Sequence, residues 1–443
     1  MVSVTAAAAV CASISARGAD LLDVFKQAQQ ADVVYSSARA SWVAAQEKFP
    51  QGRSGLLPTL SFSGSTQFND RSVTFRDPTS AGANSNARFN SNALSLSLTQ
   101  PVYRRQNTVA YEQGKTQLEV ADAVLSQAAQ DLITRVAQAY VDVLLSRDNV
   151  AFAGAQKTAI AEQLTQAKIS FQVGTATITD THEAQARYDL AVSQEIAAQS
   201  DLEIKNRALE LLIGKATPVL APLGPRLQLV SPEPMVLDRW VEAARTASPQ
   251  VRTAESNVTL AQQEIARNRG AHHPTLDAFA GWSKNTTGVG TLGNSGTNID
   301  NRNVGLQLQI PIYQGGLVTS RVREAAANED KARQDLENAR RTAELVARQN
   351  FLGVTSGIAQ VKALEAALMS SQSALDSTRL GREVGVRTQV DVLNAQQQIF
   401  SARRDLAQAK YNYIMSTLKL RAAVGQLTEQ DVVAVNAWLD RTR

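Results

Sequence analysis

The feature that most constrains this chain is an internal repeat. Four short motifs occur twice in the same order, and the two copies of each motif are 210 to 216 residues apart. The pairs are 57–60 with 273–276, 100–103 with 310–313, 173–180 with 384–391, and 211–214 with 422–425. Four landmarks at a nearly constant spacing predict two copies of one structural unit, residues 20–214 and 236–425. A linker rich in proline and glycine, residues 215–235, joins them.

Each copy contains two segments in which apolar and polar residues alternate. The segments are 59–68 and 92–102 in the first copy, and 275–284 and 303–312 in the second. Alternation with a period of two predicts β-strands that have one apolar and one polar face. The residues between the paired strands, 69–91 and 285–302, are rich in small polar residues and glycine, and we expect long loops there.

The length and polarity of these strands indicate a membrane barrel rather than a soluble β-sandwich, whose strands also alternate. A strand of about ten residues, at ~3.3 Å per residue and tilted by ~45°, spans roughly the ~25 Å apolar band of an outer-membrane barrel. The Ser, Gln and Thr residues of the polar face suit a water-filled lumen. Four strands cannot close a barrel, and an open edge in lipid leaves backbone groups without partners. Several copies of the chain are therefore required.

After each strand pair the sequence becomes helical. Apolar and small residues recur every seven positions, which predicts close packing of two long helical hairpins, residues 103–213 and 313–424. The first helix, residues 103–171, would be roughly 100 Å long, but its partner, residues 180–213, only about 50 Å. A further helix must therefore stack on the shorter partner.

Each copy begins with a helix that can fill this role. Residues 21–49 are expected to form one helix that ends before Pro50, and residues 236–271 are expected to form one that breaks near Ser248-Pro249. The predicted fold class is therefore mainly α-helical and internally duplicated, with four membrane strands in each chain. A soluble coiled-coil scaffold is the alternative, but it does not explain strand pairs inserted at matching places in both copies.

The two ends of the chain lie outside the repeat. Residues 1–19 resemble the apolar core of a secretory signal, with cleavage after Ala16 or Ala19. We interpret Cys11 as part of this signal rather than as a lipid anchor, because a lipidation motif requires a small residue before its cysteine. Residues 426–443 are expected to be a C-terminal tail. Beyond Ala19 there is no uncharged apolar run of about 18 residues, so no transmembrane helix is expected.

Composition argues against several other functions. The net charge of +4 is too balanced to indicate a nucleic-acid partner, and a single cysteine allows no disulfide framework. His272 and His273 are adjacent on an extended segment, so their side chains point to opposite faces, and we expect an interfacial role rather than a metal site. No nucleophile and base occur in a recognisable context. We therefore expect no enzyme activity, no cofactor and no bound metal.

Taken together, these features resemble the TolC family of outer-membrane export channels over nearly the whole mature chain. The most specific segment is 384–395, which continues into 411–414 and 418–420, and the signature at 173–180 also fits. The resemblance implies a homotrimer whose strands form a twelve-stranded barrel in the lipid of the Gram-negative outer membrane. The barrel would continue into a long α-helical tunnel across the periplasm. A periplasmic adaptor and an inner-membrane transporter are the implied partners.

The resemblance assigns a pore role to the start of the last long helix. Asp391 matches the position that lines the periplasmic constriction, where three copies would form an acidic ring that favours cations. The family often has a second acid one helical turn later, but this chain has Asn394 there, which predicts weaker cation selectivity. From the residues alone, Asp391 is a first-turn acid that stabilises its own helix, and the two roles are compatible.

The resemblance also implies a lock that holds the tunnel closed. Arg387 matches the family arginine that ties the inner hairpin to a neighbour, and Asp180 and Thr179 match the acceptor side. Arg382 stands where the family has a tyrosine, which predicts a rewired lock. Ordinary surface charge near a turn is the alternative for Arg387 and Asp180. The residues expected to contact the adaptor are those of the hairpin turns: Val173, Gly174, Thr175, Val384, Gly385 and Val386.

The predicted function is a passive exit duct that conducts substrate from an inner-membrane transporter to the cell exterior. The lack of a convincing lipidation motif favours type I protein secretion, with an ABC-type transporter as the partner. The alternative is the outer-membrane part of a multidrug or small-molecule efflux pump, served by a proton-driven transporter. A soluble periplasmic adaptor is more remote, because adaptors carry one helical hairpin between β-rich domains and this chain has two.

Overall fold

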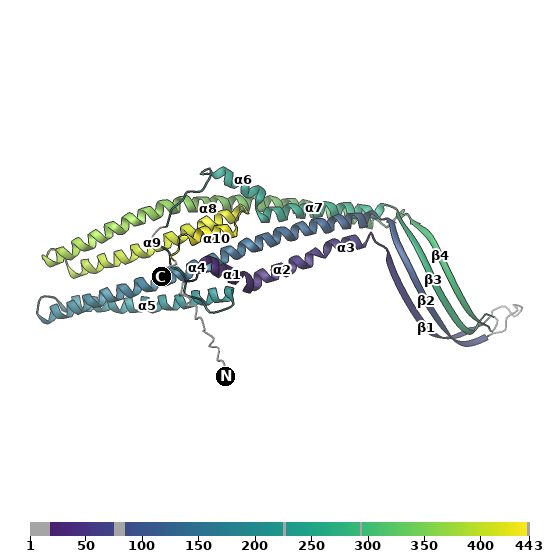
Figure 1. Ribbon diagram of the computed structural model, residues 1–443, viewed down its shortest axis with the longest axis horizontal. Helices are drawn as coiled ribbons and strands as arrows, with labels where there is room; N and C mark the ends of the chain where they lie inside the picture. Colours follow the sequence, from purple (N-terminus) through teal and green to yellow (C-terminus); the bar gives the residue numbers. More distant parts are fainter. Residues whose placement is uncertain (1–17, 75–84, 225–226, 293–294, 441–443) are drawn as a thin grey trace, which may run out of the picture. The chain divides into compact units, whose positions relative to one another are not determined.

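The computed structural model describes residues 18–74, 85–224, 227–292 and 295–440 (Figure 1). The predicted signal segment lies outside the described residues except for Gly18 and Ala19, so Cys11 and the expected cleavage after Ala16 lie outside them as well. The fold is mainly α-helical with one four-stranded sheet, as predicted. In the described ranges, no helix combines the length and the apolar character needed to cross a membrane.

The chain folds into two compact units, and each unit takes parts of both sequence copies. The first unit comprises Met1–Ala40, Ala123–Arg252 and Asn338–Arg443, and the second comprises Ser41–Asp122 and Thr253–Glu337. Two very long helices each contribute residues to both units. Packing between corresponding parts of the two copies therefore defines the compact units, rather than the order of residues along the chain.

The second unit contains the sheet. Its strands are β1 (Thr59–Val73), β2 (Ser85–Tyr103), β3 (Thr275–Leu292) and β4 (Ser295–Gln309). They are antiparallel and lie side by side in the order β1-β2-β3-β4 (Figure 1). Within the described part of one chain, β1 and β4 therefore pair on one side only. Two open edges remain, as the sequence predicts.

The strands are longer than the alternation predicts, and most of the residues expected in loops 69–91 and 285–302 belong to them. For example, Asp70 lies opposite Arg88, and the Arg88 Nε is 3.0 Å from the Asp70 carboxylate. Residues 75–84 and 293–294 of these expected loops lie outside the described residues. For the residues that the structure describes, the loop prediction is wrong because backbone pairing between neighbouring strands needs no apolar side chains. Polar residues can therefore extend the ladder of hydrogen bonds beyond the amphipathic part.

Cross-strand partners share a face, and the predicted alternation continues across all four strands. Leu98 lies opposite Leu60 on one side and Ala280 on the other, and Ala280 lies opposite Val304. Within one chain this apolar face is exposed, to 85% at Val304. The opposite face carries serine pairs joined by hydrogen bonds, Ser61 with Ser97 at 2.6 Å and Ser63 with Ser95 at 2.7 Å.

The N-terminal helical segment forms three helices rather than the single one predicted. They are α1 (Leu21–Ala31), α2 (Val33–Gln46) and α3 (Lys48–Ser54). The helical segment does not end before Pro50, which is the third residue of α3. Proline is accepted at this position because the N–H groups of the first helical turn have no intrahelical partner.

The two long helical hairpins are present as predicted. Their helices are α4 (Arg105–Gln172) with α5 (Ile178–Ile213), and α8 (Leu317–Glu383) with α9 (Gln389–Ala423). The heptad positions Leu132, Val136 and Val143 of α4 are buried. They belong to a core in the first unit to which α1, α5, α8 and α9 also contribute.

The remaining helices lie before β3 and at the end of the chain. α6 (Leu237–Ala247) and α7 (Pro249–Arg269) are separated at Ser248, which confirms the predicted break, and a short 3-10 turn, Gly270–His272, precedes β3. The segment predicted to be a C-terminal tail contains a further helix, α10 (Glu429–Asn436), which packs against α1. Its buried valines, Val432 and Val435, join the core, so the segment folds instead of remaining a tail.

A buried ion pair explains why the first helical segment breaks at Asp32. The Asp32 carboxylate accepts hydrogen bonds from Arg135 Nη1 and Nη2 at 2.9 and 3.0 Å, and from the backbone N–H of Tyr35 at 2.6 Å. The Asp32 side chain is 4% exposed. The hydrogen bonds from Arg135, together with that from Tyr35, lower the pKa of Asp32 below its ordinary value.

We expect Arg135→Ala to destabilise the first unit by roughly 1.5–3 kcal/mol near neutral pH, because it leaves a buried carboxylate without its charged partner. The lowered pKa means that this stabilisation is present above the ordinary pKa of 3.8 and is lost as the pH falls through the folded value. Thermal unfolding followed by circular dichroism should therefore show a difference between wild type and variant that shrinks below about pH 4. Arg39→Ala, which removes an exposed arginine of α2, is the control, and a pH-independent difference would contradict the assignment.

Candidate functional site at the hairpin turns

The two long hairpins end in turns of the same construction. Gly174 and Gly385 have φ angles of +76° and +82°, a left-handed backbone conformation that favours glycine. A backbone hydrogen bond of 2.8 Å closes the end of the helix before each turn. Both turns present exposed apolar side chains to the surroundings, those of Val173, Val384 and Val386. The turn residues predicted to contact an adaptor therefore form two well-defined tips, each with exposed apolar side chains.

Each returning helix begins with the same reciprocal hydrogen bonds. At α9, the Asp391 carboxylate accepts hydrogen bonds from the Thr388 backbone N–H and hydroxyl, each at 2.9 Å, and the Asp391 N–H donates to Thr388 Oγ1 at 3.2 Å. Thr177 and Asp180 form the same capping box at α5. The bonds from Thr388, and to a smaller extent the charge of Arg387, lower the pKa of Asp391. Asp391 thus stabilises the first turn of its own helix.

The pore role of Asp391 involves several chains and stays a prediction. Asn394, one turn further along α9, is exposed in the single chain, and its effect on cation selectivity stays a prediction as well. Thr177 and Thr388, the N-cap residues of these two helices, are not among the residues predicted to carry function. Their signal was nevertheless present, because a threonine three residues before an acid at a helix start is the pattern of a capping box.

The predicted lock residues Arg387 and Asp180 are not joined within one chain. In the described ranges, the hydrogen bonds of the Asp180 carboxylate come from Thr177 in its own turn, and Thr179 beside it is exposed. The Arg387 side chain instead lies against Gly381, where an added Cβ would be 2.8 Å from Arg387 Cγ. A lock that uses these residues would need a neighbouring chain, and it stays a prediction.

Arg382 lies at the centre of the contacts that join the tips of the two hairpins within the chain. Its Nη1 donates to Gln166 Oε1 at 2.9 Å, to Gln389 Oε1 at 2.9 Å and to Gln163 Oε1 at 3.4 Å. The Gln389 side chain also donates to Gln163. One guanidinium therefore connects the end of α8 and the start of α9 with α4. The acceptors of Arg382 within the chain are neutral amide oxygens, and the rewired lock at this position stays a prediction.

The glutamine partners of Arg382 could not be found by reading the sequence. Gln166 is 216 residues from Arg382. No local pattern marks one glutamine among many on a long polar helix face as the acceptor for a distant arginine. Only the register of α4 against α8 and α9 brings these side chains together.

A second link joins the hairpins nearer the core. The Tyr411 hydroxyl on α9 donates to Asp148 Oδ2 on α4 at 2.9 Å. Burial raises the pKa of Asp148 above its ordinary value, although the hydrogen bond from Tyr411 opposes the shift. Tyr411 itself is buried in the core cluster. This link is embedded in packed side chains, whereas the Arg382 cluster is partly exposed at the tips, so the tips are the part that can separate more easily.

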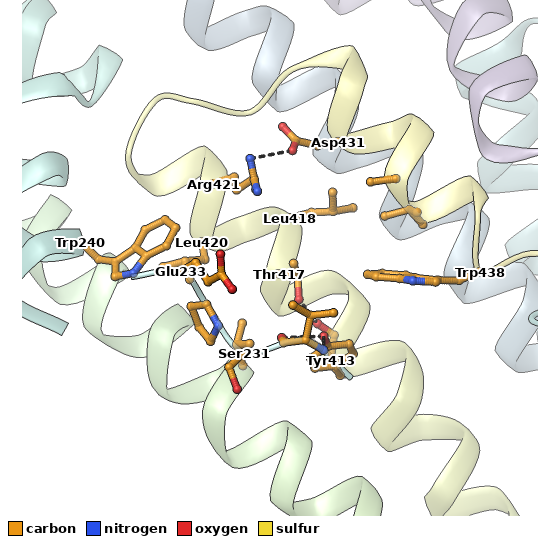
Figure 2. Close-up of a pocket in the computed structure, with 15 residues that line it drawn as sticks. Ser231, Glu233, Trp240, Tyr413, Thr417, Leu418, Leu420, Arg421, Asp431 and Trp438 are labelled. Carbon is orange, nitrogen blue, oxygen red and sulfur yellow. Dashed lines mark hydrogen bonds and ion pairs between the residues drawn. The ribbon is translucent and has the colours of Figure 1, made fainter. Parts of the chain in front are cut away.

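A cavity of about 270 Å³ lies where the linker passes α9 and α10. Figure 2 shows Trp240 and Trp438 on opposite sides of it, with the ion pair between Arg421 and Asp431, 3.0 Å apart, in its wall. The Tyr413 hydroxyl donates to the Val230 carbonyl at 2.9 Å and accepts from the Val230 N–H at 2.8 Å. These contacts anchor the linker to α9, and we assign this region a structural role.

The histidine pair lies at the junction of strands and helices. The Nδ1 atom of His273, between the 3-10 turn and β3, is 3.2 Å from the hydroxyl of Tyr103, the last residue of β2. In the part of the chain that the structure describes, no group of three or more His, Cys, Asp or Glu is arranged to hold a metal ion. The contact with Tyr103 fits the interfacial role expected for His273.

Comparison with known proteins is consistent with this architecture. The family described as outer membrane efflux protein matches residues 24–215 and 240–426. Outer membrane protein TolC of Vibrio cholerae is 32% identical over 423 residues, which cover 95% of this chain and 94% of the relative. The proteases secretion protein PrtF of Dickeya chrysanthemi is 32% identical and covers 96% of this chain, and 92% of PrtF is matched.

Two further matches extend the comparison. The alkaline protease secretion protein AprF of Pseudomonas aeruginosa is 31% identical, and the match covers 94% of this chain and 86% of AprF. The solved structure of the outer membrane protein VceC of Vibrio cholerae has a TM-score of 0.78 and 17% identity, covering 91% of this chain and 96% of VceC. At this identity the solved structure supports the fold alone. The family match and the relatives, however, span nearly the whole chain, and this chain therefore belongs to the outer membrane efflux protein family, which includes TolC.

Proposed function

We propose that this outer-membrane protein forms the exit duct of a tripartite export system and serves type I protein secretion. The main support for a duct comes from the sheet. Its four strands have one apolar and one polar face, and its two edges are open. Similarity to two protease secretion proteins supports protein cargo. The family description names efflux, which supports a small-molecule pump as the second candidate.

Closure of the barrel requires three chains in this proposal. A strand edge left open in lipid costs several kcal/mol for each unpaired backbone group. Three copies would pair β4 of one chain with β1 of the next and give a twelve-stranded barrel, within the size range of known outer-membrane barrels. The homotrimer is passive and has no catalytic activity of its own.

The partners of the duct are a periplasmic adaptor and an inner-membrane transporter of the ABC type. The exposed valines of the two tips, Val173, Val384 and Val386, offer apolar contact for an adaptor, and their glycine turns hold them in place. Within the chain, Arg382 fastens the two hairpins in the closed duct. Arg387, with Asp180 and Thr179 of a neighbouring chain, completes the lock.

The type of cargo can be tested by complementation. The chain would be expressed in a Gram-negative host that lacks its own family member and carries either a protease with its ABC exporter and adaptor, or a proton-driven drug pump with its adaptor. Protease activity in the medium without restored drug resistance is the expected result. Restored drug resistance without protease secretion would instead assign the protein to a small-molecule efflux pump. If neither resistance nor secretion is restored although the protein has assembled, the proposal that it forms an exit duct is wrong.

Asp391 is expected to control block of the duct by multivalent cations. Asp391→Ala should weaken the block of single channels in planar bilayers, because three carboxylates are removed from the proposed ring. Asp23→Ala is a matched control, because Asp23 is the acid of an equivalent capping box at the start of α1, so its removal should cost about 1 kcal/mol of helix stabilisation in the same way. Asp391→Asn removes the negative charge but keeps a side-chain oxygen that can accept hydrogen bonds, so it separates the two effects. If block by multivalent cations is unchanged in both Asp391 variants, Asp391 does not line the pore.

A further inference from the structure

Another cavity, of about 540 Å³, lies in the second unit beside the junction of strands and helices. Its wall includes Arg105 at the start of α4, Arg269 at the end of α7, His273 before β3, and Glu329 and Arg333 on α8. Three guanidinium groups therefore face one carboxylate. Such an excess of positive charge in a concave site favours an anion.

Glu329, the single carboxylate of this wall, is already paired with neighbouring side chains. Arg333 Nε lies 2.5 Å from Glu329 Oε1, and Gln262 Nε2 donates to the same oxygen at 3.3 Å. The hydrogen bond from Arg333 lowers the pKa of Glu329, so this carboxylate stays ionised and paired. In the part of the chain that the structure describes, neither Arg105 nor Arg269 forms an ion pair. Two positive charges thus remain available to a ligand.

The cavity adjoins the apolar face of the sheet. Tyr103 ends β2 and lies opposite Leu276 of β3, after an irregularity in the register between Pro101 and Tyr103. Leu276 belongs to the same face as Ala280, which lies opposite Leu98 and Val304. The Tyr103 hydroxyl is 3.2 Å from His273 in the cavity wall. Tyr103, at the end of the sheet, therefore contacts a residue of the cavity wall.

The same end of the sheet carries a belt of exposed apolar and aromatic residues. Gln309, the last residue of β4, lies opposite Thr275, the first residue of β3. Ile312 and Tyr313, which follow β4, are 96% and 86% exposed. Exposed aromatic and aliphatic residues at strand ends mark the boundary between the apolar membrane core and the headgroups. With the strands placed in the outer membrane as in the proposed function, on which this inference rests, the cavity lies at the depth where phospholipid phosphates are found.

We propose that this cavity binds the phosphate of an anionic glycerophospholipid in the periplasmic leaflet of the outer membrane. Arg105 and Arg269 supply the charge, because guanidinium groups recognise phosphate oxygens through paired hydrogen bonds. His273 orients Tyr103 toward the acyl chains. A lipid is favoured over a soluble phosphate because the cavity is next to a surface that requires lipid contact. The bound lipid would hold the strand ends and the helix ends together.

Native mass spectrometry of the purified full-length oligomer tests this proposal. Phosphatidylglycerol, phosphatidylcholine or sn-glycerol 3-phosphate would be added to the protein in detergent. Wild type should retain phosphatidylglycerol in preference to phosphatidylcholine. The double variant Arg105→Gln/Arg269→Gln should bind phosphatidylglycerol at least about tenfold more weakly, the effect expected when charge-assisted hydrogen bonds are lost. Arg105→Lys/Arg269→Lys keeps the charge but loses the paired hydrogen bonds, so its affinity should lie between those of the wild type and the glutamine variant.

The matched control is Arg239→Gln/Arg245→Gln, which removes two exposed arginines of α6 in the other unit and changes the net charge equally. It should bind lipid as the wild type does. If this control loses phosphatidylglycerol binding to the same extent, or if Arg105→Gln/Arg269→Gln loses none, the proposed site is wrong. Displacement of the lipid by an equal concentration of sn-glycerol 3-phosphate would also overturn it, in favour of a soluble anion. Heat-modifiable migration of each variant confirms that the oligomer has assembled.

Discussion

Replacing Val304 by lysine is expected to prevent assembly of the outer-membrane oligomer. Val304 is on the apolar face of β4, five residues from the end of the strand at Gln309, and is 85% exposed in one chain. At ~3.3 Å per residue and a tilt of ~45°, it lies about 12 Å from that end, near the middle of the ~25 Å apolar band. A lysine at this depth costs about 2–4 kcal/mol, and the cost arises in every copy of the chain.

The neighbouring residue provides the control for this substitution. Asn303 has the opposite orientation and lies opposite Gly281 on the polar face, so Asn303→Lys should assemble like the wild type. The measurement is the fraction of protein that migrates as an oligomer when outer-membrane samples are loaded without heating. Normal assembly of Val304→Lys would show that this face does not contact lipid, and failure of both variants would show that position 303 also faces an apolar environment.

Removing the side chain of Arg382 is expected to open the duct without unfolding it. Arg382 is the shared hydrogen-bond donor for Gln163, Gln166 and Gln389. Without it, these neutral oxygens can bind water at the partly exposed tips, so the folded chain loses little stability. A hydrogen bond to a charged group contributes about 1.5–3 kcal/mol, so the open state of Arg382→Ala should become at least about tenfold more populated. Resting conductance in planar bilayers measures this population.

Arg379→Ala is the matched control, because Arg379 is an exposed arginine of α8 only three residues before Arg382. It should leave the conductance at the wild-type level. Arg387→Ser probes the lock between chains separately, and it should also raise the conductance if Arg387 contacts a neighbouring Asp180. A conductance that responds to Arg387→Ser but not to Arg382→Ala would place the whole lock between chains. The contact observed within the chain would then be structural only.

The features of the hairpin turns that have a local signal can be located from the sequence, whereas those without a local signal cannot. The turns at Gly174 and Gly385 could be located because left-handed backbone positions favour glycine. The acid of each returning helix could also be located, since a capping box lies within four consecutive residues. The glutamine partners of Arg382 could not, because side chains 216 residues apart meet only through the packing of three helices.

The fold follows the same division. The sequence by itself determined the duplicated order of helices and strands, the two faces of the sheet and the long hairpins, because periodicity of two or of seven residues is a property of neighbouring positions. Tertiary structure decided how far the strands extend, since pairing between strands, rather than residue type, continues β1 and β2 past Phe68 and before Asn92. It also decided that Asp32 divides the first helical segment, because the Asp32 carboxylate is held by Arg135, 103 residues away, on α4. Local patterns thus specify the elements, whereas contacts between distant residues set their limits and the links that hold the hairpins together.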